Sequence, residues 1–326
     1  MSDAGSLPGY DELPVVPGAP PHSAWGLWGD DDQLGALNLL GGERLVEASR
    51  LIRKGAMFPL NWEMELPDPI IAGRARRQLP RHSYVVYGKT SIEDVLDNYY
   101  PQSSSQWDAF SHAGHPEYGF YNGATLEDVM SPDAPKCGIE NWARRGIAGR
   151  GVLLDVGRWL EETGREFDYT TTTAITVDDL EKVRLHQDVE IRTGDVLLIR
   201  TGWMKFYLAQ RRRWRFEIGG NPVIPGLESS RDMVRYLWNL HVAAIAADNM
   251  AVEALRMGEQ RNPLEEDVSL HRDLMALCGV PLGEFWYLEG LADDCARDHV
   301  YECMLTSAPM NKRGGAGSPP NALAMK

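Results

Sequence analysis

Cysteine is scarce in this sequence, and its scarcity argues against two kinds of fold. The chain has 326 residues and four scattered cysteines, Cys137, Cys278, Cys295 and Cys303. None of them forms a Cys-x-x-Cys pair. A disulfide framework needs a higher cysteine density in a smaller chain, and a zinc ribbon needs paired thiolates. The sequence therefore predicts neither.

Positive charge and long apolar runs are also lacking. There are 33 basic and 47 acidic residues, a net charge of −14, whereas nucleic-acid and anionic-membrane binders need a basic surface. No apolar run approaches the ~18 residues of a membrane span. The first 24 residues are rich in proline and glycine and have neither the basic nor the apolar region of a signal peptide. We therefore expect a cytoplasmic protein with no nucleic-acid or membrane partner.

Several catalytic motifs are absent. The sequence has no Gly-x-Ser-x-Gly elbow, no His-Glu-x-x-His and no P-loop. The glycines of "GIAGRG" (146–151) precede an apolar run rather than follow one, which is typical of a turn and not of a dinucleotide loop. The common signatures of serine hydrolases, zincins and nucleotide-binding enzymes are thus missing.

Apolar runs alternate with helical patterns along the chain. We predict strands at 55–66, 82–88, 151–156, 195–203, 242–248 and 301–307, and helices at 42–53, 138–146, 176–185, 229–240 and 269–279. Mixed β and α runs without a repeat favour a single α/β domain with a mixed sheet core and flanking helices. Residues 1–24 are predicted to form an extended arm that lies on the body or on a partner subunit, and residues 25–326 the domain.

Polar residues that suit a catalytic centre occur in three places. "PQSSSQWDAFSHAGH" (101–115) contains Asp108, His112 and His115. His271 lies in the first turn of a predicted helix, and Glu284 follows a Pro and a Gly among apolar residues. A catalytic metal needs a few such ligands and a nearby acid or base. On the sequence alone, an exposed or capping polar group is the simpler reading of Asp108, His112, His271 and Glu284, because spacing does not establish that they converge.

The chain resembles the cyclase family, which includes the bacterial kynurenine formamidases and isatin hydrolases. The resemblance rests on several segments in the family's order: "WGDDDQLGALNLL", "SSSQWDAFSH" followed by "YNG", "RGIAGRGVLLDV", "GDVLLIRTGW", "AADNMAVE", "LHRDLMALCGVPLGEFWYLEGLAD" and "TSAPMNKRGGAGSPPNALA". It implies a swivelling β/β/α domain. It also implies a homodimer or homotetramer whose N-terminal segments reach across subunits.

The resemblance also implies a set of metal ligands. The family pattern His-x-Gly-Thr-His-x-Asp-x-Pro-x-His falls on Gln102, Ser104, Ser105, Gln106, Asp108, Phe110 and His112. Asp108 and His112 match, whereas glutamine replaces both leading histidines. The distal histidine and glutamate ligands fall on His271 and Glu284. One divalent metal, Zn or Mn, held by Asp108, His271 and Glu284, is therefore implied in place of two, and a metal-free site stays open.

The resulting hypothesis is a hydrolase of a cyclic or aryl amide, lactam, lactone or formamide. A metal would activate water, and His112 would be the general acid/base. A metal-free lyase or cyclase is the alternative, in which His112 is the base and His115 or Asp108 orients it. A non-catalytic small-molecule binder is the third reading. The expected substrate contacts are Gln102, Gln106, Tyr121, Asn122 and Trp28.

Overall fold

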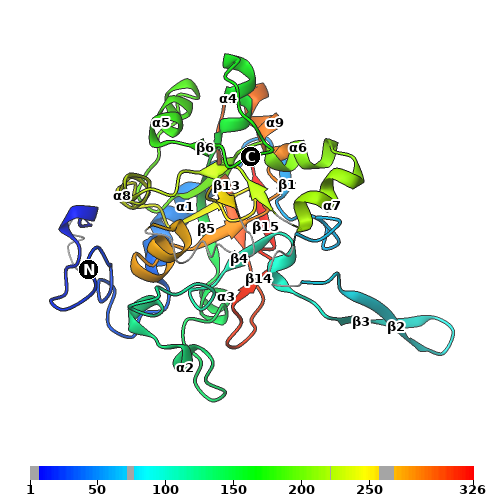
Figure 1. Cartoon of the computed structure of the whole chain (residues 1–326), viewed down its shortest axis with the longest axis horizontal. Helices are drawn as coiled ribbons and strands as arrows, with labels where there is room; N and C mark the ends of the chain where they lie inside the picture. Colours follow the sequence, from blue (N-terminus) through cyan, green and yellow to red (C-terminus); the bar gives the residue numbers. More distant parts are fainter. Residues whose placement is uncertain (1–6, 72–76, 221, 257–267) are drawn as a thin grey trace.

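One large mixed sheet organises the chain (Figure 1). The computed structural model describes residues 7–71, 77–220, 222–256 and 268–326. Within them, nine strands form the sheet, in the order β1-β15-β13-β5-β7-β10-β12-β4-β14. These strands are β1 (Met57–Pro59), β4 (Gln106–Asp108), β5 (Ile147–Asp155), β7 (Val196–Arg200), β10 (Ala244–Ala247), β12 (Leu282–Glu284), β13 (Glu302–Ser307), β14 (Gly317–Ser318) and β15 (Ala322–Met325).

The centre of the sheet is parallel and buried. β5, β7, β10 and β12 run parallel, and antiparallel strands extend the sheet on both sides. The runs Val152–Leu154, Val196–Ile199 and Ala244–Ala247 are almost completely buried. Continuous apolar strands are what a sheet covered on both faces requires. The strands predicted at 151–156, 195–203, 242–248 and 301–307 are confirmed, with shifted bounds, whereas 55–66 shrinks to the three residues of β1.

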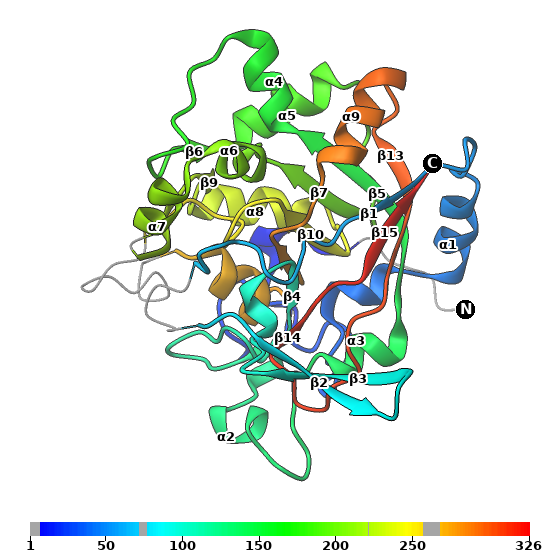
Figure 2. The same cartoon turned by 90° about the vertical axis from the view of Figure 1, so that its right-hand side faces the viewer.

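Helices cover the two faces of this sheet. In Figure 2, α1 lies on one side of β5, and α5 and α8 lie on the other. The α-helices are α1 (Gly42–Ser49), α2 (Leu126–Val129), α3 (Glu140–Arg145), α4 (Val156–Thr163), α5 (Val177–His186), α6 (Trp203–Ala209), α7 (Arg212–Gly220), α8 (Arg231–Asn239) and α9 (Glu289–Asp298). Shorter helical segments are η1 (Tyr10–Glu12), η2 (Gly35–Leu39), η4 (Pro101–Ser103), η5 (Tyr121–Gly123) and the π-helix η7 (His271–Leu277). None of the helices in these described ranges has the length and apolarity needed to cross a membrane.

Two predicted helix starts have different outcomes. Thr176 caps α5 as predicted, because its hydroxyl accepts the N–H of Asp179 while that carboxylate accepts the N–H of Thr176. Ser269, the predicted cap of the helix at 269–279, is not one. The helix is the π-helix η7, and the Ser269 hydroxyl donates instead to Glu253. The buried carboxylate of Glu253 is thus the partner of this hydroxyl in place of a helix N–H. Glu253 is also part of the candidate metal centre.

The described part of the N-terminal arm, residues 7–24, lies along the body against α8. The Trp238 indole N–H donates to the carbonyl of Pro8, and the N–H of Tyr10 donates to Asn239. The Tyr10 ring is buried and stacks on His22, with ring centroids 4.6 Å apart. The arm therefore belongs to the packed body of its own chain at this end.

In the described ranges, three small two-stranded sheets accompany the main sheet. Two are short pairs, β6 (Ala174–Ile175) with β9 (Gly226–Leu227) and β8 (Val223–Ile224) with β11 (Leu255–Arg256). The third pairs β2 (Arg81–Tyr87) with β3 (Ser91–Asp97), and it projects away from the body as a ribbon (Figure 1). The strand predicted at 82–88 thus exists but lies outside the main sheet.

Candidate metal centre

The candidate centre begins with two short neighbouring strands. β4 and β12 pair antiparallel, with Gln106 opposite Glu284. Because side chains alternate along a strand, Gln106 and Asp108 share one face of the sheet, and Trp107 points to the other face, into the core. Gln106, Asp108 and Glu284 are 1%, 0% and 5% exposed. The pairing thus places two carboxylates and an amide side by side in a buried setting.

The helix η7 brings an imidazole to these carboxylates. His271 is the first residue of η7. Its Nε2 lies 2.9 Å from Oε1 of Glu284 and 3.8 Å from Oδ2 of Asp108. One ligand atom from each of the three residues lies within 4.8 Å of the others. Two carboxylate oxygens and an imidazole nitrogen suit Zn²⁺ or Mn²⁺. The fold therefore brings the three sequence-predicted ligands together.

Glu253 is the site residue that the sequence analysis missed. Its Oε1 lies 3.0 Å from Nδ1 of His271. The same carboxylate accepts the hydroxyls of Ser229 and Ser269 and the backbone N–H of Leu270. A signal was present, because Glu253 is a carboxylate between Val and Ala just after the apolar run 242–248. The same argument had selected Glu284.

The carboxylates set the protonation of the cluster. Burial opposes the charged imidazole, but Asp108, Glu253 and Glu284 outweigh it and raise the pKa of His271 well above its usual range. Burial alone would raise the pKa of Asp108, yet His112 and His271 lower it. Burial would likewise raise the pKa of Glu253, but its bond with His271 holds that pKa below the usual value. The centre is therefore a region of concentrated negative charge around one imidazole.

Gln106 shows that the residues fit a cation. Its Nε2 lies 2.9 Å from Oε2 of Glu284 and 3.3 and 3.4 Å from the two oxygens of Asp108. Its Oε1 is buried and accepts no hydrogen bond from any residue that the structure describes. An amide that turns over exchanges these two atoms, so its oxygen can face a cation beside the carboxylates. This orphaned oxygen, together with the three converging donors, fits a divalent ion.

His112 lies at the margin of the cluster. Its Nε2 is 3.7 Å from Oδ1 of Asp108, and its ring centroid is 6.4 Å from that of His271. Its side chain is 29% exposed, whereas the Asp108 side chain is fully buried. His112 therefore stands between a buried carboxylate and solvent, a position that suits a proton carrier.

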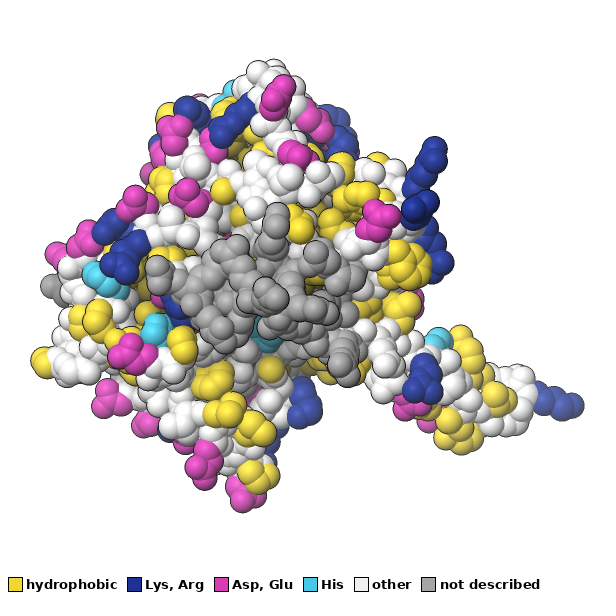
Figure 3. Space-filling model, in the orientation of Figure 1, with side chains coloured by type: hydrophobic (Ala, Val, Ile, Leu, Met, Phe, Trp, Pro, Cys, Tyr) yellow, Lys and Arg dark blue, Asp and Glu magenta, His cyan; other side chains and the backbone are white. Residues whose placement is uncertain are grey.

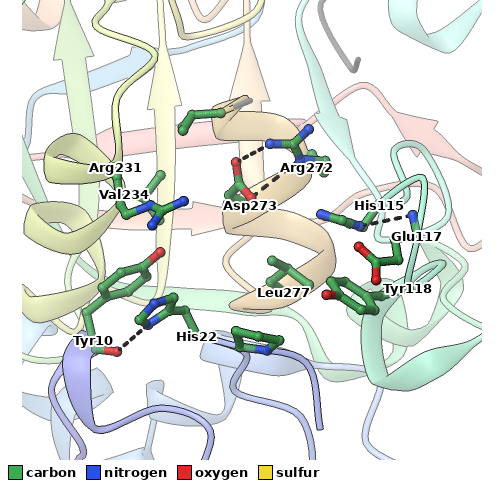
Figure 4. A pocket seen from close by; sticks show the side chains of 12 residues that line it. Tyr10, His22, His115, Glu117, Tyr118, Arg231, Val234, Arg272, Asp273 and Leu277 are labelled. Carbon is green, nitrogen blue, oxygen red and sulfur yellow. Dashed lines mark hydrogen bonds and ion pairs between the residues drawn. The ribbon is translucent and has the colours of Figure 1, made fainter. Parts of the chain in front are cut away.

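His115 lines a cavity whose lining residues include none of Asp108, His271 and Glu284 (Figure 4). Its Nδ1 accepts the N–H of Glu117, and its ring stacks on Tyr118 with centroids 4.6 Å apart. The cavity, of about 280 Å³, is also lined by Tyr10 and His22 of the arm. Burial lowers the pKa of His115, and nearby Arg272 lowers it further. The contacts described for His115 are thus made in this cavity, and its predicted role in orienting His112 stays a prediction.

Apart from Gln106, which lies in the centre, the expected substrate contacts lie in packing positions. The Tyr121 hydroxyl donates to Asp32, and Asn122, at φ 54°, donates to the Asp32 and Gly29 carbonyls. Both residues therefore hold the loop that contains Asp32.

Trp28 packs edge-on against Trp238 of its own chain, with ring centroids 6.4 Å apart. The Gln102 side chain lies against Gly317 of β14. The substrate-binding roles proposed for Gln102, Tyr121, Asn122 and Trp28 stay predictions.

Comparison with known proteins places this geometry in a family. The model of the family described as putative cyclase matches residues 64–254 of the chain. A search of curated proteins finds no match. A crystal structure described as a novel cyclase is 33% identical, covers 93% of this chain and 99% of its own, and has a TM-score of 0.80.

More distant structures share the fold. Isatin hydrolase A from Labrenzia aggregata, bound to benzyl benzoate, is 16% identical and covers 86% of this chain and 97% of its own, with a TM-score of 0.56. Isatin hydrolase A from Ralstonia solanacearum is also 16% identical, covers 83% and 92%, and has a TM-score of 0.54. The expected α/β fold with a mixed sheet and flanking helices is thereby confirmed. Because the family model matches more than half of the chain and the novel cyclase is similar over nearly all of it, this chain belongs to the cyclase family.

Proposed function

We propose that this protein is a hydrolase that cleaves an amide, lactam, lactone or formamide bond in a cyclic or aryl substrate, using one divalent metal. The observation that carries this proposal is the buried convergence of Asp108, His271 and Glu284, whose ligand atoms lie within 4.8 Å of one another. The isatin hydrolases, which share the fold, bear a name that agrees with a hydrolase.

Asp108, Glu284 and Nε2 of His271 would hold the ion. When bound, a divalent metal lowers the pKa of a water molecule and polarises a carbonyl oxygen. Glu253 would accept a hydrogen bond from Nδ1–H of His271 and so direct the lone pair of Nε2 toward the ion. Zn and Mn both accept this combination of oxygen and nitrogen donors.

His112 would move the proton. Its Nε2 faces Asp108 at 3.7 Å, so the carboxylate stabilises the imidazolium that forms when His112 takes a proton from water. His112 then returns the proton to the leaving nitrogen or oxygen. Its partial exposure lets a substrate approach from the solvent side.

Gln102 and Gln106 favour one metal ion per chain over two. The family pattern has histidines at the positions of Gln102 and Gln106. An amide oxygen is a weaker neutral ligand than imidazole, and an amide nitrogen does not bind metal. Gln102 lies against Gly317, whereas Gln106 bridges the carboxylates of the centre. We therefore propose one metal per chain.

A metal-independent lyase or cyclase is a second candidate, favoured by two particular observations. The Gln106 amide nitrogen already bridges both carboxylates, and the raised pKa of His271 supplies a positive imidazolium between them. The Gln106 amide and the His271 imidazolium thus offset part of the negative charge of Asp108 and Glu284 without a metal ion. In this mechanism His112 would be the base that acts directly on the substrate.

Metal analysis of protein purified without chelators separates the candidates. We expect about one Zn or Mn per wild-type chain and none in His271→Ala, because loss of the imidazole leaves two carboxylates as the remaining ligands. The matched control is His186→Ala, which removes an exposed histidine paired with Glu162 and should keep the metal. Turnover of a panel of cyclic amides, lactones and aryl formamides should stop after chelation. Turnover by metal-free wild-type protein would support the second candidate.

A further inference from the structure

The cavity that His115 lines is enclosed by several elements that the proposed hydrolase mechanism does not use (Figure 4). Its volume of about 280 Å³ is just below the range of about 300–1,000 Å³ that is usual for small-molecule sites. Such a volume suits a molecule of about one ring rather than a nucleotide. We call it the arm cavity, after the arm, α8 and η7, which line it through Tyr10, His22, Arg231, Val234, Asp273 and Leu277.

Two of the four charged side chains of the arm cavity neutralise each other. The Nη2 atom of Arg272 lies 3.1 Å from Oδ2 of Asp273. The same oxygen accepts the backbone N–H of Ser269 at 2.9 Å. The other two charged side chains, Arg231 and Glu117, lie on opposite sides of the cavity in Figure 4. The cavity therefore has a positive end and a negative end.

Arg231 is the group that suits an anion. It is the first residue of α8, it is exposed, and its guanidinium forms no ion pair with any residue that the structure describes. Its planar fork of N–H donors matches a carboxylate. Figure 3 shows basic side chains and histidines next to one another on the face where the arm meets α8.

The Tyr10 hydroxyl adds a second donor at the positive end. It lies beside the Arg231 guanidinium in Figure 4. Burial raises the pKa of Tyr10, and the nearby Arg231 offsets this rise only in part. The hydroxyl therefore keeps its proton at neutral pH and can donate to an anion that Arg231 holds.

Aromatic and apolar groups form the walls between the two charged ends. Tyr10 stacks on His22, and His115 stacks on Tyr118, each pair with ring centroids 4.6 Å apart. The two pairs stand on opposite sides of the cavity, with Leu277 between them (Figure 4). Such walls favour a ligand with a flat, apolar body.

We propose that the arm cavity binds a small aromatic monocarboxylate. The carboxylate pairs with the Arg231 guanidinium and accepts the Tyr10 hydroxyl, while the ring lies on Leu277 between the aromatic pairs. Hydrogen bonds to a charged group are about twice as strong as neutral ones, so Arg231 contributes most of the affinity. Glu117, at the other end, disfavours a second negative charge on the ligand, because like charges repel.

The helix η7 contributes to both sites, so a test must tell them apart. His271, its first residue, lies in the candidate metal centre, whereas Arg272, Asp273 and Leu277 line the arm cavity. A carboxylate can also bind a metal ion. Substitutions that touch only the arm cavity are therefore the informative ones.

Benzoate is the probe, and isothermal titration calorimetry with the full-length protein measures its Kd. Arg231→Met removes the guanidinium from an exposed position and should raise the Kd at least about tenfold. Tyr10→Phe keeps the buried ring and should raise it about threefold. The matched control is Arg213→Met, which removes an arginine of α7 whose side chain is 91% exposed. This control should change the Kd by less than about twofold.

Three other probes test the chemistry of the ligand. Benzamide has the ring without the charge, inorganic phosphate has the charge without the ring, and terephthalate has a second carboxylate at the opposite end of the ring. Each should bind at least about tenfold more weakly than benzoate. Glu117→Gln should strengthen the binding of terephthalate more than that of benzoate, because it removes the charge that opposes the second carboxylate.

Four results would overturn the proposal. They are no binding of benzoate to the wild type up to about 10 mM, equal effects of Arg231→Met and Arg213→Met, phosphate binding as tight as benzoate binding, and binding that a chelator abolishes but Arg231→Met leaves unchanged. The last result would assign benzoate to the metal centre. Circular dichroism checks that each variant is folded. None of these measurements requires turnover, so their outcome is separate from that of the proposed hydrolase activity.

Discussion

Glu253 and His271 form a carboxylate–imidazole pair in which Oε1 of the glutamate lies 3.0 Å from Nδ1 of the histidine. The other ring nitrogen, Nε2, faces Glu284 at 2.9 Å. A carboxylate beside Nδ1 favours a proton on that nitrogen, and Nε2 is the ring atom that faces the centre. Histidines that bind metals are commonly oriented by a carboxylate in this way.

Replacing Glu253 should weaken metal binding while leaving the three ligands in place. Glu253→Gln keeps the size of the side chain but removes the charge that supports Nδ1–H. Loss of such an outer partner typically costs 10–100-fold in metal affinity. Competition with a chromogenic chelator would measure this loss.

The matched control for Glu253 is Asp248→Asn, which changes a carboxylate that is also buried but accepts hydrogen bonds from Thr201 and Gly202. We expect its stability to fall and its metal affinity per folded chain to stay near wild type. Equal loss of affinity in both variants would mean that Glu253 acts only through folding.

Acid stability should depend on Asp298, which holds the end of the chain. The Nζ of Lys326 lies 2.8 Å from Oδ1 of Asp298, and the Nζ of Lys54 lies 2.6 Å from Oδ2. Partial burial raises the pKa of Asp298, but these ammonium groups outweigh it and lower the pKa from 3.8 to about 2. A depressed folded-state pKa contributes stability above pH ~4, which is lost as the pH falls through about 2.

Asp298→Asn should therefore lower the free energy of unfolding by about 1–2 kcal/mol at pH 7. The difference from wild type should shrink between pH ~4 and ~2, because the wild-type carboxyl becomes protonated there. Urea denaturation at several pH values would measure it. Asp178→Asn is the control, since the Asp178 side chain is 72% exposed in a surface pair with Lys182, and such pairs contribute little. A constant difference across this pH range would show that the ionised carboxylate is not what stabilises the chain end.

The docked arm predicts a large effect of one aromatic side chain. Tyr10 is 5% exposed, stacks on His22 and lies under the Arg235 guanidinium. Tyr10→Ala should cost about 3–5 kcal/mol of unfolding free energy, as truncation of a buried aromatic does. Val15→Ala, at a side chain that is 43% exposed, should change it by less than about 0.5 kcal/mol. Similar small costs for both variants would mean that the arm does not pack on the body as described.

The sequence predicted those parts of the fold that depend on local pattern. The buried parallel strands β5, β7 and β10 read as apolar runs because both of their faces are covered. The cap at Thr176 depends on residues three positions apart, so it is visible in the sequence. The proposed ligand set of Asp108, His271 and Glu284 was implied by the family resemblance, since Asp108 lies more than 150 positions before the other two residues and spacing cannot show that they converge.

The remaining features depend on how distant segments meet. Glu253 contacts His271 because the segment after β10 passes the start of η7. Neither local sequence predicts that contact. Ser269 has the residue type of a helix cap, but a buried carboxylate takes its hydroxyl. Tyr121 and Asn122 were expected to contact substrate, yet both donate hydrogen bonds to Asp32, about 90 residues earlier. Tertiary contacts, not local preference, determine each of these positions.

His112 is the residue on which both proposed mechanisms depend. With a metal it would move a proton between water and the leaving group, and without one it would be the base. General acid–base assistance contributes roughly 10²–10⁴ in rate. His112→Ala should therefore lower kcat by about that factor on the substrate identified from the panel. KM should change less, because a proton carrier acts mainly in the transition state.

Two further measurements separate a proton carrier from a ligand at this position. Metal content of His112→Ala should stay near wild type, because Asp108, His271 and Glu284 remain within 4.8 Å of one another. His112→Asn preserves much of the size of the side chain but should not restore kcat, since an amide cannot carry the proton. If His112→Ala loses its metal together with its activity, His112 is a metal ligand, and its assignment as the proton carrier is wrong. If it keeps full activity, the reaction takes place away from the 101–115 segment, and Gln102 and Gln106 have no part in it.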